Sequence, residues 1–230
     1  MSASDGGRPT IHVCFHGIGA CAAEREPGES RYWVTEDAFH RVLDALVETG
    51  LVSTGRVAVS FDDGNRSDAA IALPALRERG MTATFFALAG RLHDPASLSP
   101  HDLRDLRDAG MRIGSHGWRH TSWRRLTDAD AQRELIDARL ALAEAAGTHI
   151  TEAALPLGQY DRTTLARLRA ASYRAVYSSD RYPARAGAWL RPRFSVTADD
   201  TAASVRRWAT RRRPLAEARN AAASAVKRLR

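Results

Sequence analysis

The stretch Val57-Ala58-Val59-Ser60-Phe61-Asp62-Asp63-Gly64 is an apolar run that ends in two adjacent carboxylates and a glycine. Its alternating β-branched and small residues predict a buried strand, and the glycine allows a sharp turn directly after it. The two acids therefore lie at the C-terminal end of a strand, where the loops of α/β folds collect catalytic groups. Two neighbouring acids can divide metal binding and proton transfer between them. The alternative is an ordinary Asx-turn with a hydrated Asp pair.

A second motif, Gly114-Ser115-His116-Gly117-Trp118-Arg119-His120, follows a later predicted strand. The spacing of His116 and His120 allows both imidazoles to reach one ion, and Gly117 favours a tight loop over a helix. Two imidazoles and one carboxylate leave coordination positions open for water and substrate, as a catalytic metal site requires. The alternative is a pair of loop histidines bonded to backbone carbonyls.

Together, Ser-Phe-Asp-Asp-Gly and Ser-His-Gly-Trp-Arg-His resemble the polysaccharide deacetylase family, which is also called the NodB-homology or carbohydrate esterase 4 family. The stretch Ala154-Leu155-Pro156-Leu157-Gly158-Gln159-Tyr160-Asp161 is similar to the family's Pro-x-Gly segment, so the resemblance runs from about His12 to about Val196. It implies a distorted (β/α) barrel that hydrolyses the N-acetyl group of a sugar or polysaccharide to a free amine and acetate. The implied roles are Asp62 as the base, Asp63, His116 and His120 as ligands of one divalent metal, and the Leu157 N–H as a donor to the oxyanion. Zinc is the metal that we expect, with Co, Ni, Mn and Fe as alternatives.

Three positions depart from the family pattern. The family often has an arginine that orients the base where this chain has Ala154, and a Ser or Thr where it has Gly117. No histidine follows His149, so the family's late histidine, the usual general acid, is absent. We therefore expect another group to hold Asp62 and another residue to act as the acid.

His16 is the replacement acid that we predict, with His12 and metal-bound water acting unaided as the alternatives. It follows the first predicted strand, 11–15, which in a barrel neighbours the strand that carries the acids, and its ordinary pKa suits proton transfer near neutrality. Aromatic side chains near these loops can stack on sugar faces, with core packing as the alternative for each. The predicted substrate-binding residues are Trp118, Tyr160, Trp189 and Arg193.

The 230-residue chain is 44% hydrophobic, which is enough for one sizeable core and predicts one domain with a tail. We predict a flexible N-terminus at 1–10, a deacetylase-like catalytic domain at 11–200 and a basic helical tail at 201–230. The first ten residues lack the apolar core of a signal peptide, and no apolar stretch is long enough to span a bilayer, so we expect a cytoplasmic protein. Cys14 and Cys21 are too few for a disulfide framework.

The positive charge of the chain lies in the predicted tail. From Thr201 onward nine basic residues accompany one acid, Glu217, whereas the rest of the chain is near neutral. Arg211-Arg212-Arg213 precedes an Ala-rich amphipathic segment, and we predict that the tail binds an anionic membrane surface; a helix docked on the barrel is the alternative. We expect no nucleic-acid partner, since no recognition module is present, and the sequence leaves the oligomeric state open.

Repeated strand-then-helix alternation predicts a mainly parallel α/β architecture. Strands are predicted at 11–15, 81–88, 174–178 and 189–196, and helices are predicted to begin after the caps Thr35, Ser99 and Thr127. The leading hypothesis is a metal-dependent N-deacetylase. One alternative is a catalytically inactive carbohydrate-binding relative, motivated by the missing late histidine, and the other is a hydrolase of a non-sugar amide or cyclic imide on the same fold.

Overall fold

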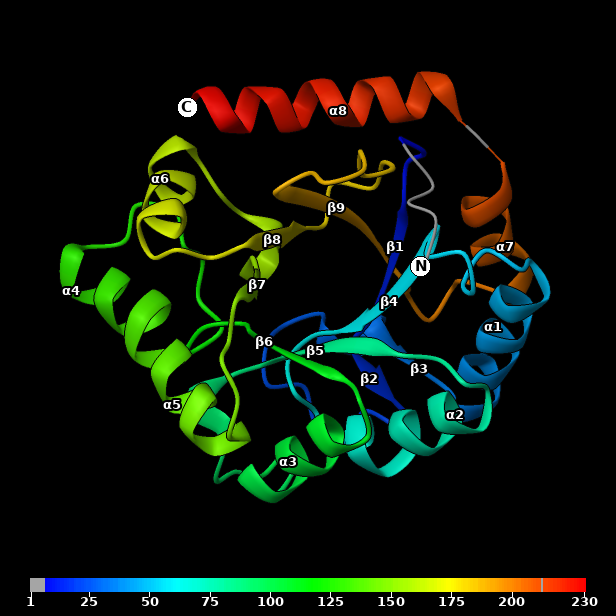
Figure 1. The fold of residues 1–230 in the computed structure, drawn as a ribbon, viewed down its shortest axis with the longest axis horizontal. Coiled ribbons are helices and arrows are strands. Elements are labelled where there is room, and N and C mark those ends of the chain that lie inside the picture. The colour runs from blue at the N-terminus through cyan, green and yellow to red at the C-terminus, as the bar shows by residue number, and fades with distance from the viewer. Residues whose placement is uncertain (1–6, 212) are drawn as a thin grey trace, which may run out of the picture.

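The computed structural model describes residues 7–211 and 213–230. Seven parallel strands close into a barrel in the order β1-β4-β5-β6-β7-β8-β9, and β9 pairs back onto β1 (Figure 1). The distorted (β/α) barrel expected from the sequence is therefore confirmed. The strands are β1 (Ile11–Phe15), β4 (Val57–Phe61), β5 (Ala83–Ala87), β6 (Arg112–Ser115), β7 (Glu152–Ala154), β8 (Ala175–Ser178) and β9 (Leu190–Ser195).

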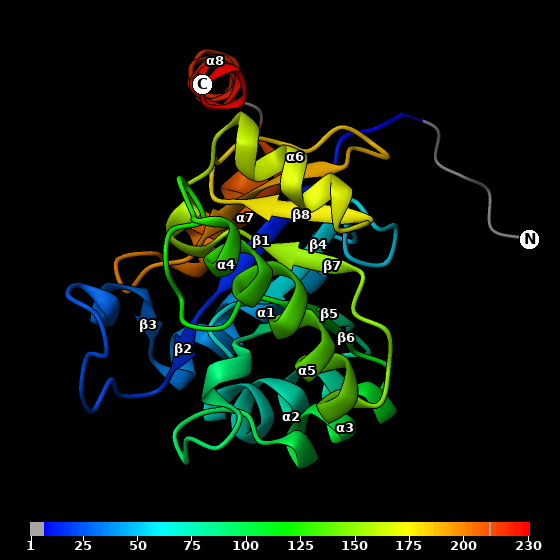
Figure 2. The ribbon, with the colours of Figure 1, turned by 90° about the vertical axis from the view of Figure 1, so that its left-hand side faces the viewer.

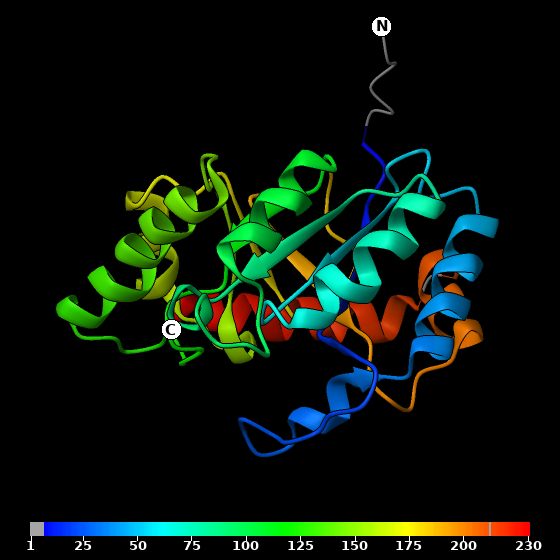
Figure 3. The ribbon, with the colours of Figure 1, turned by 90° about the horizontal axis from the view of Figure 1, so that it is seen from below.

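A layer of helices surrounds the barrel, as the view from below shows (Figure 3). The α-helices are α1 (Glu36–Glu48), α2 (Leu73–Glu78), α3 (Pro100–Asp108), α4 (Asp128–Ala131), α5 (Ala138–Ala146), α6 (Arg162–Ala170), α7 (Ala202–Thr210) and α8 (Pro214–Leu229). The side chains of Thr35, Ser99 and Thr127 each accept a hydrogen bond from a backbone N–H in the first turn of the helix that follows, so the three predicted caps are confirmed. The segment Gln132–Asp137 joins α4 to α5 as a π-helical stretch, and Gly147 ends α5 in the left-handed conformation.

Alternate residues of β4 face opposite sides of the barrel wall. The rings of Phe15, Phe61 and Phe85 stack on one another, with centroids 5.5 Å and 4.6 Å apart, and Phe39 of α1 packs edge-on against them. Residues of the opposite parity on β4 face inward, since Ser60 accepts a hydrogen bond across the barrel from β9. Successive side chains of a strand point to opposite faces. Because Phe61 packs outward under a helix, Asp62, which follows it, points into the barrel.

A small two-stranded sheet lies at one end of the barrel and was not predicted. It pairs β2 (Gly17–Ile18) with β3 (Trp33–Val34), and the loop between them includes the short helix Glu29–Tyr32. The ring of Trp33 lies directly over Gly17, where an added Cβ would meet it at 2.1 Å. This contact fixes the exit of β1 and with it the position of the β2–β3 loop.

The C-terminal segment is docked on the barrel, which was the alternative given above to a membrane-binding tail. α7 packs against α1, and α8 lies beside α6 across the outer side of the barrel (Figures 1 and 2). Of the predicted flexible N-terminus, residues 1–6 lie outside the described residues, as does Arg212 in the tail, whereas Thr10 pairs with Ala184 in an isolated β-bridge. Among the described residues, no helix combines the length and apolar content needed to cross a bilayer.

Candidate active site

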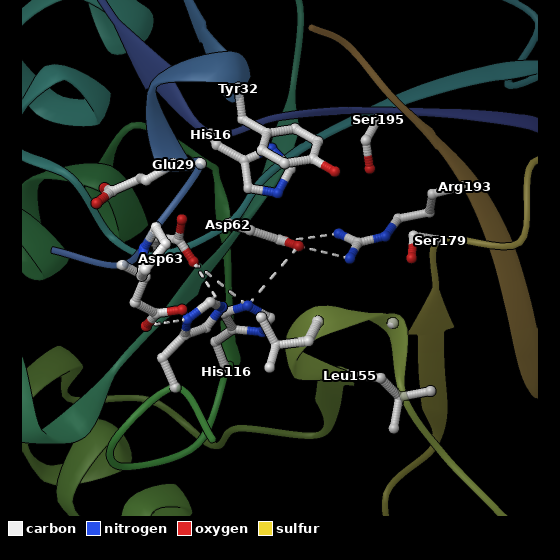
Figure 4. Close-up of a pocket in the computed structure, with 16 residues that line it drawn as sticks. His16, Glu29, Tyr32, Asp62, Asp63, His116, Leu155, Ser179, Arg193 and Ser195 are labelled. Atoms are coloured by element: carbon white, nitrogen blue, oxygen red, sulfur yellow. Dashed lines mark hydrogen bonds and ion pairs between the residues drawn. The ribbon is translucent and has the colours of Figure 1, made fainter. Parts of the chain in front are cut away.

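Loops at the C-terminal ends of the strands bring the two sequence motifs together (Figure 4). Asp62 and Asp63 directly follow β4, and His116 directly follows β6. Asp63 and His120 both adopt left-handed backbone conformations, with φ of 73° and 57°, which turn the chain sharply at each side chain. Parallel strands end at the same edge of a sheet. The two aspartates and the two histidines, which are at least 53 positions apart in the sequence, therefore meet at this end of the barrel.

Asp63 and His116, both buried, and the partly buried His120 form a cluster with metal-ligand geometry. The Oδ1 atom of Asp63 lies 3.4 Å from Nε2 of His116 and 3.3 Å from Nε2 of His120. This oxygen is buried and has no hydrogen-bond partner in the described part of the chain. Burial alone raises the pKa of Asp63, but the close approach of His116 and the charges of the neighbouring histidines hold the pKa well below its ordinary value. One carboxylate oxygen and two imidazole nitrogens therefore face a common point.

The other ring nitrogen of each histidine is occupied by an oxygen acceptor. Nδ1 of His116 lies 3.0 Å from the carbonyl oxygen of Ala154, and Nδ1 of His120 lies 2.5 Å from Oε1 of Glu26. A proton on each Nδ1 leaves the Nε2 lone pairs free for a cation, which is the arrangement that metal-binding histidines adopt. The residues present thus fit a divalent metal. No motif in the sequence pointed to Glu26, which comes from the β2–β3 loop.

Asp62 is set apart from Asp63 by a paired arginine. The two terminal guanidinium nitrogens of Arg193, Nη1 and Nη2, donate to Asp62, one to each carboxylate oxygen and each at 2.6 Å. Burial raises the pKa of Asp62, but the charge of Arg193 outweighs it and holds this pKa below the ordinary value. Arg193, which was predicted to bind substrate, lines the cavity with 1% of its surface exposed, and it is also the group that holds Asp62 in a chain that has Ala154 where the family often has an arginine.

The histidine loop is braced by Glu134, another residue that the sequence did not single out. Its buried carboxylate accepts hydrogen bonds from the backbone N–H groups of Trp118 and Arg119 and from the Arg119 side chain. Glu134 therefore braces the loop in a chain that has Gly117 where the family often has a Ser or Thr. Glycine is also required there, because its φ is 91° and an added Cβ would meet a Glu134 oxygen at 2.5 Å.

A cavity of about 210 Å³ opens in front of the two carboxylates. His16, predicted to line the site, does so, and its ring lies 4.8 Å from that of Tyr32. Burial lowers the pKa of His16, so its imidazole is neutral in the resting protein, and its Nδ1 has no partner among the described residues. The other lining residues are Glu26, Pro27, Gly28, Glu29, Asp62, Asp63, His116, His120, Leu155, Leu157, Gly158, Ser179, Arg193 and Ser195.

The three aromatic residues predicted to stack on sugars lie elsewhere. Tyr160 is 1% exposed and its hydroxyl donates to Asp180. The indole N–H of Trp189 donates to the carbonyl oxygen of Tyr173, and the ring is covered by Arg169. The Trp118 ring is covered by the guanidinium of Arg133, 3.3 Å from its centroid. Each packs against its own neighbours, so the aromatic residue that faces the cavity is Tyr32, which the sequence did not indicate.

The sequence profile named Polysaccharide deacetylase matches residues 50–176, more than half of the chain. This chain belongs to the polysaccharide deacetylase family. The match includes both motif loops and Leu157. A relative from Bacillus subtilis (strain 168), YxkH, is 28% identical over 109 residues, which are 47% of this chain and 39% of YxkH. The aligned region thus spans about two fifths of that relative.

Solved structures share the fold of this family member. The deacetylase PplD of Streptococcus pyogenes, solved with acetate, superposes with a TM-score of 0.73 at 18% identity, over 86% of this chain and 96% of PplD. IcaB from Ammonifex degensii gives 0.72 at 22% identity, over 87% and 97% of the two chains. BC0361, a polysaccharide deacetylase from Bacillus cereus, gives 0.75 at 15% identity, over 89% and 70%. At these identities the likeness establishes the barrel, and the chemistry rests on the residues described above.

Proposed function

We propose that this chain is a metal-dependent deacetylase that hydrolyses the N-acetyl group of an N-acetylated sugar to a free amine and acetate. One observation carries the proposal. The Oδ2 atom of Asp62 lies 3.9 Å from Nε2 of His116, the same nitrogen that faces Asp63. An ionised base therefore adjoins a three-residue metal-binding set at the floor of a cavity, which is what hydrolysis of an amide by an activated water requires.

Zinc is the metal that we propose for Asp63, His116 and His120. Two imidazoles and one carboxylate suit zinc and leave a position open, whereas Co, Ni, Mn and Fe accept similar donors. When bound, the ion supplies a Lewis acid that polarises the amide carbonyl and lowers the pKa of water.

Asp62 acts as the base in this proposal. Arg193 keeps the carboxylate ionised and fixes the plane of its oxygens, while the lone pairs that Arg193 leaves free can accept the proton of the attacking water. The contacts support this division of roles, because Asp62 is bonded to an arginine and Asp63 is directed at the two histidines.

Leu157 and His16 are assigned the two remaining roles. The N–H of Leu157, at the opposite wall, donates to the oxyanion as the carbonyl becomes tetrahedral, a contribution of roughly 10²–10³ in rate. His16 protonates the departing amine. Since the pKa of His16 is lowered, it has to take up its proton during the cycle rather than hold one at rest.

The cavity favours a small reacting group. Its volume of about 210 Å³ is below the ~300–1,000 Å³ of ordinary ligand sites. We therefore propose that it admits one acetamido group with its sugar ring, and that any further part of a polymer lies outside. A small non-sugar amide also fits a cavity of this size and is therefore the second candidate substrate.

Acetate release separates these functions. Purified protein should be stripped of metal and assayed with and without zinc on N-acetylglucosamine, its oligomers and a cyclic imide. Zinc-dependent acetate release from the sugars supports the proposal, and the Asp62→Asn variant should keep its metal while losing ~10²–10⁴ of the rate. Turnover of the imide alone would favour the other hydrolase, and binding of oligomers without turnover would favour an inactive relative.

A further inference from the structure

Helix α8 contacts two wall segments of the cavity from behind. Lys227, the only lysine in the chain, donates from Nζ to Asp180 Oδ1 at 2.6 Å and to the carbonyl oxygen of Gly158 at 3.4 Å. Gly158 itself lines the cavity, and Asp180 follows Ser179, which lines it as well. The C-terminal helix is therefore bonded to the segment after β7 and to the segment after β8.

These two wall segments also touch each other. An added Cβ on Gly158 would meet the Ser179 hydroxyl at 2.0 Å, and Gly158 has a φ of 60°. Leu157, just before it, has a φ of 57°, which is uncommon for a residue with a side chain. Such a conformation persists only when its surroundings hold it. The loop Pro156–Gly158, which presents the Leu157 N–H, thus depends on contacts from outside itself.

A directed chain of hydrogen bonds joins α8 to the same loops. Tyr160 donates to Asp180 at 2.7 Å, and burial raises the pKa of Tyr160, so its hydroxyl keeps the proton that it donates. Ser224 of α8, 2.7 Å from the Tyr160 oxygen, must then be the donor in that contact. Tyr182 completes the chain by donating to Ser224 at 3.1 Å. Asp180 also accepts from Ser178 and Lys227, so it is the point at which the barrel and the helix meet.

The carboxylate of this network is withdrawn from solvent, whereas its ammonium is partly exposed. The Asp180 side chain is 4% exposed, that of Lys227 is 40% exposed, and Ser224 is fully buried. The ammonium of Lys227 is a compact charge that can donate to a carboxylate and a carbonyl together, and its Nζ also lies 5.1 Å from the centre of the Tyr160 ring. One side chain therefore links the helix to Asp180, Gly158 and Tyr160.

We propose that α8 is part of the catalytic unit, and that Lys227 and Ser224 are positioning residues that hold the Pro156–Gly158 loop in the conformation that aims the Leu157 N–H at the oxyanion. The inference rests on the proposed deacetylase function. It assigns the C-terminal helix a role in the rate of the reaction, through the loop and not through contact with the substrate. The metal-binding residues lie on other strand ends, so the helix should leave metal binding unchanged.

Kinetics of two variants test the proposal. Lys227→Met and Ser224→Ala should each lower kcat about tenfold to a hundredfold, as a small misplacement of a catalytic group does, while KM and a 1:1 zinc content stay near those of the wild-type protein. Lys227→Arg, which can still pair with Asp180, should recover most of the loss. Arg230→Met removes the same charge from the exposed end of α8 and should keep the wild-type kcat. A wild-type kcat in both Lys227→Met and Ser224→Ala would overturn the proposal.

Amide hydrogen exchange gives a readout that does not depend on activity. In Lys227→Met, peptides covering 155–160 and 178–182 should lose protection, whereas peptides covering 57–64 and 112–120 should not change. If the wild-type protein hydrolyses none of the substrates, the proposed function fails, and selective loss of protection would still support the bracing of the loop. Unchanged exchange at 155–160 would overturn it.

Discussion

Arg193 and Asp62 form a bidentate ion pair across the inside of the barrel, with both N–O distances at 2.6 Å and both side chains buried. The two residues lie 131 positions apart, on β9 and after β4. The arginine neutralises the buried carboxylate, orients it and keeps it ionised. The pair therefore supplies, from the last strand, the support that the family commonly draws from the position of Ala154.

Replacing Arg193 with Met should raise the pKa of Asp62, because burial then acts without its main opposing charge. In the wild-type protein the lowered pKa keeps Asp62 ionised at pH values at which an ordinary aspartate would take up a proton. In the variant the acid limb of the pH–rate profile should move to higher pH, and the fold should lose ~3–5 kcal/mol of stability. Arg191→Met, on the same face of β9, is the control; an unmoved limb in Arg193→Met would mean that another group sets this pKa.

Replacing His116 with Ala should abolish stoichiometric metal binding, since one of three donors is lost from a buried site. Metal content of the purified variant, measured by mass spectrometry, checks this. His101→Ala changes an exposed helical histidine and should retain the metal. Full metal content in His116→Ala would contradict the assignment of the site.

Replacing Glu26 with Gln should weaken zinc binding about tenfold to a hundredfold, because the carboxylate that accepts from His120 Nδ1 orients the ring and raises its basicity. Competition with a chelating dye measures the affinity. Glu24→Gln, in the same loop but bonded to Ser30, is the matched control. Equal affinities for the two variants would show that Glu26 does not support the site.

Replacing His16 with Gln tests the proposed acid. The variant should lose most of the wild-type rate, since Gln cannot transfer a proton to the leaving amine. Its metal content should stay at the wild-type level. A variant that keeps the wild-type rate would make His16 structural and place the acid elsewhere.

The docked tail still presents a surface suited to an anionic membrane. Leu215, Val226 and Leu229 are 89%, 46% and 80% exposed along α8, and exposed arginines flank them. We propose that this face binds anionic lipid, with ~1 kcal/mol from each basic side chain. Binding to vesicles rich in phosphatidylserine should fall steeply with salt and should weaken in an Arg213→Gln, Arg219→Gln variant. Salt-independent binding, or none, would refute this.

The sequence by itself determined a mainly parallel α/β architecture and placed the candidate metal ligands at strand ends, because both depend on local patterns, whereas closure into a barrel was implied by the family resemblance. Val57–Gly64 encodes a strand, a turn and two acids in eight residues, and the ends of parallel strands converge whatever the rest of the chain does. The caps of the helices were predictable for the same reason. The resemblance of the two motifs to the family was enough to propose Asp63, His116 and His120 as ligands, without knowledge of the loops around them.

Only the tertiary structure decided what supports those residues. Arg193 reaches Asp62 because the barrel closes between β9 and β1, and Glu26 reaches His120 across 94 positions because a small sheet fixes its loop. Neither contact can be predicted from a periodic pattern or from the spacing of a motif in the sequence. The predicted positions of the aromatic residues differ from the structure for a related reason. The direction of a loop side chain depends on which neighbour packs against it, and arginines pack against Trp118 and Trp189. Contacts between distant segments exist only once the chain has closed around its core.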